Sequence, residues 1–148
     1  MTKVNQVWYL GNLSFQVIEG DIFDVDTCAI VNSEQTDFIL APEGSGTVSG
    51  GILAKCGNEI QKDLLGQTKG KVMNEGTVLE TKGCNDIEKI FHIGFHYPNS
   101  WIQDYDDDQE AEYIRIISAS IRDVLTKFFN SNLQSISFPL IGCGLFGL

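Results

Sequence analysis

The feature that most constrains this chain is a buried strand that opens into a glycine loop near its end. Residues 135–148 read SISFPLIGCGLFGL. Serine and large apolar side chains alternate from Ser135 to Leu140, which predicts a strand buried on one face or on both. The glycines that follow can take positive φ and turn backbone N–H groups towards a phosphate. An ordinary turn after a strand would give the same pattern, so this segment alone leaves both interpretations open.

Length and charge limit the classes of protein that the sequence can encode. At 148 residues, with 43% hydrophobic and 20% charged residues, the composition excludes disorder and predicts a single domain over residues 1–148. The net charge of −10 repels a nucleic-acid backbone, so we expect no direct binding to nucleic acid. Any anionic ligand must then be held by backbone amides and helix N-termini rather than by a basic patch.

Nothing in the sequence predicts secretion, membrane insertion or metal binding. The first ten residues lack a signal-peptide pattern, and no stretch approaches eighteen consecutive apolar residues. We expect a soluble protein of the cytoplasm or nucleus that binds no membrane, no cofactor and no metal. His92 and His96 share one face of a predicted strand but have no third ligand in register. The four cysteines lack metal-ligand spacing, and we expect reduced, mostly buried thiols (Cys28, Cys56, Cys84 and Cys143).

The order of the predicted elements indicates the fold class. Two strands, a third strand, a helix, two strands, a helix and a last strand predict a three-layer α/β/α sandwich with a mixed central sheet. The first helix follows a glycine-rich segment and has an apolar residue every four positions through 52–64. The strands are predicted at 7–10, 15–21, 27–34, 77–81, 89–96 and 135–140, and the second helix at 108–130.

Three further positions could face a ligand. Asp21 lies just past a strand and can accept a hydrogen bond from an amino group, although a solvated loop carboxylate is the simpler interpretation of the residue by itself. Asn32 lies where strand 27–34 is expected to end, which suits either a ligand site or a turn. The segment Gly46–Gly51 leads into a helix N-terminus, which attracts phosphate. It matches neither the dinucleotide-binding nor the Walker glycine pattern.

Taken together, three segments resemble the macrodomain family, whose members bind ADP-ribose. They read GDIFDVDTCAIVNS at 20–33, GTVSGGI at 46–52 and SISFPLIGCGLFG at 135–147. The strand FHIG at 91–94 is also similar to a strand of that family. The resemblance spans nearly the whole chain, and it implies the macrodomain fold and the binding of ADP-ribose or of mono-ADP-ribosylated protein.

The resemblance also implies where the ligand would lie. Asp21 matches the acid that accepts from the adenine amino group, and the Ile22 amide lies beside the same base. Asn32 and Gln35 fall at the two asparagine positions of the family's N-A-A-N segment, near the distal ribose. The first phosphate loop matches Gly46, Thr47, Val48, Ser49 and Gly50. The second matches Ile141, Gly142, Cys143 and Gly144, followed by Leu145, and Phe146 matches the aromatic position that packs near the adenine or its ribose.

Several departures from the family imply weak or absent hydrolysis. Gln35 replaces the second asparagine, and Ser49 replaces the aspartate of one hydrolytic branch. A second hydrolytic branch of the family uses a lysine and an aspartate. In this sequence His96 falls near the lysine position and Leu148 near the aspartate region. The catalytic residues therefore stay unassigned. Two alternatives remain open, namely an ADP-ribosyl hydrolase or O-acetyl-ADP-ribose deacetylase with other catalytic groups, and a structural domain with a degenerate pocket.

In the macrodomain family, a helix and a strand follow the second glycine loop, and that strand lies inside the sheet. This sequence ends at Leu148, so the resemblance implies a domain that lacks the last helix and strand. A truncation, a partner or a rearranged N-terminal strand would each account for the difference. An unpaired sheet edge would otherwise favour self-association.

Overall fold

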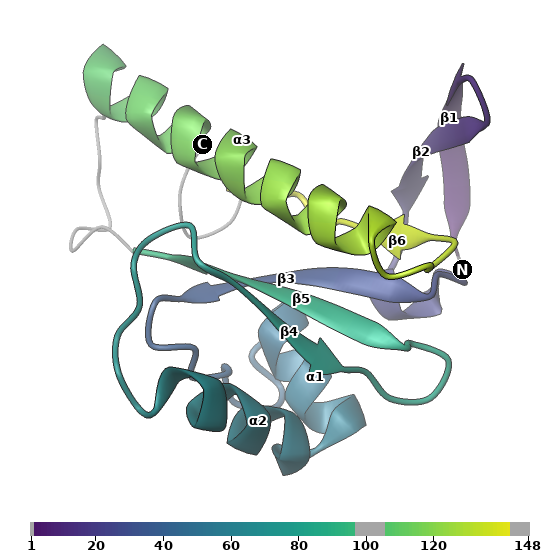
Figure 1. Ribbon diagram of the computed structural model, residues 1–148. Helices are drawn as coiled ribbons and strands as arrows, with labels where there is room; N and C mark the ends of the chain where they lie inside the picture. Colours follow the sequence, from purple (N-terminus) through teal and green to yellow (C-terminus); the bar gives the residue numbers. More distant parts are fainter. Residues whose placement is uncertain (1, 97–105, 143–148) are drawn as a thin grey trace.

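The computed structural model describes residues 2–96 and 106–142, and a four-stranded mixed sheet forms their centre (Figure 1). The strand order is β4-β5-β3-β6. β3 (Ala29–Gln35) is parallel to β5 (Lys89–Phe95) and to β6 (Ile136–Ser137), whereas β4 (Val78–Lys82) is antiparallel to β5. Every residue of β5 after the first is buried, as expected of a strand that is covered on both faces.

Helices cover both faces of this sheet. α1 (Val48–Cys56) and α2 (Asn58–Thr68) lie on one face, and α3 (Asp107–Phe129) crosses the other (Figure 1). Because side chains alternate along a strand, Ile30 packs with apolar residues of α1 and α2, whereas Val31 packs with those of α3. The predicted α/β/α sandwich with a mixed sheet is therefore confirmed. Among the described residues, no helix has the length and apolar character needed to cross a membrane.

α3 begins at a capping box. The Asp106 carboxylate accepts from Gln109 N at 2.8 Å, and Gln109 Oε1 accepts from Asp106 N at 3.2 Å. Three further acids, Asp107, Asp108 and Glu110, lie in the first turn, where negative charge is favourable. The helix predicted at 108–130 is confirmed to within one residue at each end.

The predicted first helix is in fact two helices. Gly57 has φ of 74° and lies between α1 and α2, where it ends the first and precedes the second. The apolar repeat continues across the break, and Ile52, Ile60 and Leu64 are all buried against the sheet. Glycine reaches positive φ without a Cβ clash, so the chain changes direction at this position while its apolar side chains stay on the core side.

The expectation of four reduced cysteines is wrong for one pair. Cys56, at the end of α1, forms a disulfide with Cys84, in the connection between β4 and β5, and their Cα atoms are 5.3 Å apart. Cys28 is free and half-buried. The two paired residues are 28 positions apart in the sequence, so only the tertiary fold brings them together.

The two strands expected first form a hairpin that stands apart from the central sheet. β1 (Lys3–Leu10) pairs antiparallel with β2 (Leu13–Glu19) around a turn at Gly11, which has φ of 59°. Among the described strands, these two pair only with each other, and nearly all of their residues are exposed. The hairpin projects from the end of the molecule near β6 (Figure 1).

The last strand is shorter than predicted. β6 contains only Ile136 and Ser137, both half-buried, and it pairs with the first residues of β3. The carbonyl oxygen of Ser135 accepts from Ala29 N at 3.1 Å, which extends the contact by one residue. Leu140, expected to continue the strand, is 84% exposed.

Candidate ligand-binding site

The first glycine-rich loop has the backbone shape that an anion site needs. Gly44 and Gly46 have φ of 78° and 74°, conformations that side-chain-bearing residues rarely adopt. Thr47 is the N-cap of α1, and its Oγ1 accepts from Gly50 N at 3.0 Å. Within the described residues, no recorded hydrogen bond uses the N–H groups of Val48 or Ser49. These two amides are the donors that the first turn of α1 can offer to a ligand.

Gly50, predicted to contact the ligand, has a packing role in the structure. A Cβ atom at this position would clash with Ser45 Oγ and would lie 2.5 Å from Pro42 O. Its own N–H already donates to Thr47. Glycine at position 50 therefore lets the loop fold back onto the helix start, which fixes the loop shape rather than supplying a free donor.

The second predicted loop is described only at its start. Ile141 is half-buried and packs against the apolar residues on the α3 side, and Gly142 has φ of 87°. The positive φ agrees with the predicted glycine turn. Four other predicted contacts lie outside the described residues (Cys143, Gly144, Leu145 and Phe146).

Asp21 and Ile22 lie beside α1. One carboxylate oxygen of Asp21, Oδ1, accepts from Phe23 N at 2.9 Å and caps the short 3₁₀ helix η1 (Ile22–Asp24). Ile22 packs against the apolar cluster between α1, α2 and the sheet. The Phe23 ring fills the space beside Gly51 of α1, where a Cβ would lie 2.5 Å from the ring. The fold thus holds the Asp21 segment against the helix that carries the first glycine loop.

The strand expected at 27–34 is observed as Ala29–Gln35, so Asn32 lies inside β3 rather than at its end, as was expected. Asn32 is fully buried within the strand, so its side chain does not face an open site. Gln35 is the exposed last residue of β3, and its carbonyl oxygen accepts from Phe38 N at 3.0 Å in the turn that follows. Of the two positions assigned to the distal ribose, Gln35 is the one that solvent reaches.

Asn32 belongs to a buried polar chain that crosses three strands. Its Nδ2 lies 3.3 Å from His92 Nδ1 on β5, and His92 Nε2 lies 2.9 Å from Thr81 Oγ1 on β4. If Asn32 donates to Nδ1, then Nε2 carries the proton and donates to Thr81. Burial lowers the pKa of His92 to about 3, so the imidazole is neutral. Within the described residues, Asn32 Oδ1 has no hydrogen-bond partner.

A buried carboxyl group beside the first loop was not predicted from the sequence. Glu34 is 4% exposed, and it accepts from the Ser49 hydroxyl of α1 and from Gln35 N at 3.0 Å. Ser49 Oγ in turn accepts from Ala41 N at 2.8 Å. Burial raises the pKa of Glu34, while the hydrogen bonds from Ser49 and Gln35 oppose that shift. These hydrogen bonds connect β3, α1 and the segment at Ala41 that leads into the first glycine loop.

The alternation along β3 was the signal that could have identified Glu34. Ile30, Asn32 and Glu34 point to the same face because side chains repeat every two residues in a strand. A polar residue on a face that is otherwise apolar indicates a buried hydrogen-bonded group. The family resemblance instead assigns the ligand contacts of this strand to Asn32 and Gln35.

A family model for the Macro domain matches residues 31–148, which is most of the chain. The chain belongs to the Macro domain family. This macrodomain is 28% identical over 138 residues to the human protein mono-ADP-ribosyltransferase PARP14, covering 93% of this chain and 7% of that protein. It is 31% identical over 138 residues to mouse protein mono-ADP-ribosyltransferase PARP9, covering 92% of this chain and 14% of that protein. The chain thus spans only a small part of these two relatives.

Solved structures show the same fold. The Oceanobacillus iheyensis macrodomain with ADP superposes with a TM-score of 0.76 at 24% identity, and a mutant of it with ADPR gives 0.73 at the same identity. In both cases the match covers 100% of this chain and 74% of the other. The family model thus confirms the family predicted from the three sequence segments, and the solved structures confirm its fold.

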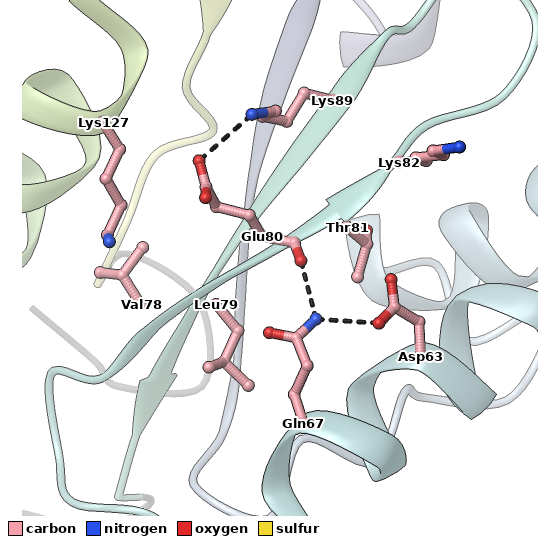
Figure 2. A pocket seen from close by; sticks show the side chains of 9 residues that line it. All are labelled: Asp63, Gln67, Val78, Leu79, Glu80, Thr81, Lys82, Lys89 and Lys127. Atoms are coloured by element: carbon pink, nitrogen blue, oxygen red, sulfur yellow. Dashed lines mark hydrogen bonds and ion pairs between the residues drawn. The ribbon is translucent and has the colours of Figure 1, made fainter. Parts of the chain in front are cut away.

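The macrodomain also has an open cleft of about 380 Å³ beside the edge strand β4. Figure 2 shows its lining side chains, which come from α2, β4, β5 and α3. Gln67 Nε2 donates to Asp63 at 3.0 Å and to Glu80 O at 2.8 Å, and Lys89 pairs with Glu80 at 3.4 Å. None of the lining residues belongs to the predicted ligand-binding set, so this cleft is distinct from the candidate site.

The two histidines do not form a metal site with the residues that the structure describes. Both ring nitrogens of His92 are within hydrogen-bond distance of Asn32 or Thr81. His96 is exposed after β5, where its N–H donates to Glu75 at 3.1 Å and its carbonyl accepts from the Tyr113 hydroxyl at 2.9 Å. No group of three or more potential metal ligands is found among the described residues.

Proposed function

We propose that this macrodomain binds ADP-ribose, either free or attached to protein, and hydrolyses such conjugates weakly or not at all. The observation that carries the proposal is the first glycine loop. It is held open at Gly44 and Gly46, capped by Thr47, and followed by two helix N–H groups without recorded partners in the described chain. A helix N-terminus of this kind stabilises a phosphate without any basic side chain.

With the diphosphate at the first glycine loop, positions for the other parts of the ligand can be proposed. The adenine amino group would donate to Asp21, whose second carboxylate oxygen is not used by the η1 cap. The distal ribose would lie near Gln35, at the exposed end of β3. The relatives support this ligand class, because two are named as mono-ADP-ribosyltransferases and a third macrodomain was solved with ADP and, as a mutant, with ADPR. A mono-ADP-ribosylated protein is accordingly the proposed partner.

Calorimetric titration with ADP-ribose tests this function. We expect saturable binding with one site per chain, and weaker binding of ADP and of AMP because each lacks part of the contact surface. AMP also tests the loop, since it has one phosphate in place of the diphosphate. No detectable binding of ADP-ribose at millimolar concentration would instead support the structural domain with a degenerate pocket.

A second candidate function, slow hydrolysis, rests on Glu34. A carboxyl group whose pKa is raised by burial can act as a general acid or base near a cleft. Both of its oxygens already accept hydrogen bonds, from Ser49 and from Gln35 N, and the group is almost fully buried. We therefore rank binding above hydrolysis.

A further inference from the structure

Gln61 of α2 lies outside the predicted ligand-binding set, yet its side-chain amide binds the backbone segment that joins β3 to the first glycine loop. Its Oε1 accepts from Leu40 N at 2.7 Å, and its Nε2 donates to Phe38 O at 3.0 Å. A backbone N–H can only donate and a carbonyl can only accept, so one orientation of the amide satisfies both partners. The half-buried Gln61 thus holds the segment on both sides of Ile39.

The segment that Gln61 holds has an unusual backbone conformation. Phe38 has φ of 55°, which a residue with a side chain rarely adopts, and its ring is fully buried. Gly94 of β5 leaves room for that ring, because a Cβ there would lie 2.8 Å from Phe38 Cζ. A strained backbone of this kind persists only where its neighbours fix it, and such strain occurs preferentially at functional sites. The two hydrogen bonds from Gln61 supply part of that fixation.

The same segment connects the two ends of the proposed site. Phe38 N donates to Gln35 O at 3.0 Å, beside the position proposed for the distal ribose. Ala41 N donates to Ser49 Oγ at 2.8 Å, and Ser49 lies in the first turn of α1. The N–H group of Ser49 is one of the two that are proposed to bind phosphate. A displacement of Leu40 would therefore reach the phosphate end of the site through Ala41.

We propose that Gln61 is a positioning residue of the ligand site, which holds residues 38–41 so that the first glycine loop has its binding conformation before the ligand arrives. The inference rests on the proposed function, because it concerns the affinity for ADP-ribose. Phe38 and Leu40 also belong to the apolar cluster under α1 and α2, which lie on the same face of the sheet (Figure 1). A preformed loop raises affinity because it need not be ordered on binding.

Two glutamines of α2 provide a matched test by calorimetric titration with ADP-ribose. Gln67 also makes two hydrogen bonds, to Asp63 and to Glu80 O, but it lies in the separate cleft beside β4. Methionine has the length of glutamine without its amide, so Gln61→Met and Gln67→Met remove the same groups. Gln61→Met should raise the dissociation constant about tenfold, as expected when only about one molecule in ten has the competent loop, and Gln67→Met should leave it within about twofold.

Hydrogen exchange of the ligand-free proteins distinguishes positioning from a general loss of stability. In Gln61→Met, the N–H groups of Leu40 and Ala41 should exchange at least about tenfold faster than in the wild type, whereas those of β5 should change little. Gln67→Met should leave the exchange of Leu40 and Ala41 unchanged. If Gln61→Met does not fold, Gln61→Glu replaces it with the same expected direction, because a carboxylate keeps the acceptor for Leu40 N and loses only the donor to Phe38 O.

Three results would overturn the inference while the proposed function stands. They are wild-type affinity in Gln61→Met, an equal loss of affinity in both methionine variants, and exchange that is accelerated equally throughout the sheet. A wild type that does not bind ADP-ribose would overturn the proposed function and the inference with it. The two failures are distinguishable, because only the second is seen in the protein without any substitution.

Discussion

At the scale of single residues, Asp21 has one observed role and one proposed role. Its Oδ1 caps η1 through Phe23 N at 2.9 Å, and in the proposed complex its other oxygen would accept from the adenine amino group. We expect Asp21→Ala to weaken ADP-ribose binding by about 1.5–3 kcal/mol, the value of a hydrogen bond to a charged acceptor. Asp21→Asn keeps an oxygen for the cap but presents an amide donor to the amino group, so calorimetry should show a similar loss. An Asp21→Asn variant with wild-type affinity would remove the carboxylate from the site.

His92 gives the protein a specific dependence on pH. Its folded-state pKa of about 3 lies below the ordinary value of 6.5, so only the unfolded chain binds a proton between these values. The contribution of His92 to the free energy of unfolding is full above pH 6.5. Below that value it decreases by about 1.4 kcal/mol for each pH unit. Glu34 acts in the opposite direction, because its pKa is raised by burial. The effect of His92 on stability is therefore measured by comparing the wild type with a variant that lacks this histidine.

Urea unfolding of the wild type and of His92→Gln at pH 7 and pH 5 measures that difference. Glutamine can replace the hydrogen bonds to Asn32 and Thr81 but cannot take up a proton, so the variant should lose about 2 kcal/mol less than the wild type over this interval. His96→Gln is the matched control, because His96 is exposed, and it should follow the wild type. An NMR titration that finds His92 protonated near pH 6 would contradict the prediction independently of stability.

At the scale of elements, the loop before α1 should bind the diphosphate through its backbone. Gly46 and Gly57 form a matched pair, because both have φ of 74° and neither would bring a Cβ within 4 Å of another atom. Alanine at either position should cost about 1–3 kcal/mol of stability through backbone strain. Only Gly46→Ala should also weaken ADP-ribose binding, since only this residue belongs to the loop. Equal affinities of the two variants in calorimetry would exclude the loop from the site.

Salt dependence distinguishes a backbone site from a basic one. The residues from Gly44 to Ser49 include no lysine or arginine, so the diphosphate would meet N–H groups and a helix dipole at short range. We expect the dissociation constant to change little between about 0.05 and 0.3 M salt. A steep decrease in affinity would indicate a cationic side chain in the site.

The elements that the sequence predicted well are those with a strong local pattern. β3 begins with three buried apolar residues, β5 is rich in isoleucine and phenylalanine, and α3 has a clear 3.6-residue period with acids at its start, so local physics determines these elements. The break at Gly57 was missed because the apolar repeat continues across it. The disulfide of Cys56 could not be predicted, because its partner comes near only when the β4–β5 connection packs beside α1.

The candidate site was predictable only in part, for a similar reason. The first loop and Asp21 follow from glycine positions and from the family resemblance, and the structure places both beside α1. The roles of Glu34 and Ser49 depend on which side chains meet across the core. In the sequence, Ser49 is a serine in place of an aspartate, whereas in the fold its hydroxyl donates to the buried carboxyl group of Glu34.

At the scale of the whole molecule, the net charge of −10 and the proposed anionic ligand are compatible because the proposed site is local. Electrostatic repulsion from surface carboxylates decays over about 10 Å in physiological salt, whereas the amides of α1 would act in direct contact. The acidic surface lowers the rate of association with an anion more than the affinity of a formed complex. It also disfavours contact with nucleic acid, so binding should be specific to the ADP-ribose group.

The same fold should bind ADP-ribose without efficient turnover. Hydrolysis needs a positioned base and an oriented distal ribose, and a group displaced by about one ångström can cost on the order of a hundredfold in rate. Gln35 is longer than the asparagine it replaces, and Ser49 is not a base near neutral pH. Glu34, the nearby carboxyl group, is 4% exposed and already accepts two hydrogen bonds. No suitable base for water is therefore free among these three residues.

Release of ADP-ribose from mono-ADP-ribosylated glutamate or aspartate substrates measures this turnover. We expect a rate at least about a hundredfold below that of a hydrolytic macrodomain under the same conditions, because a missing general base alone costs 10²–10⁴. Glu34→Gln should leave any residual rate unchanged if the carboxyl group only supports the loop, and calorimetry on the same variant shows whether the ligand still binds. A rate comparable to that of the hydrolytic enzyme would contradict the prediction, and loss of that rate in Glu34→Gln with binding intact would identify Glu34 as the base.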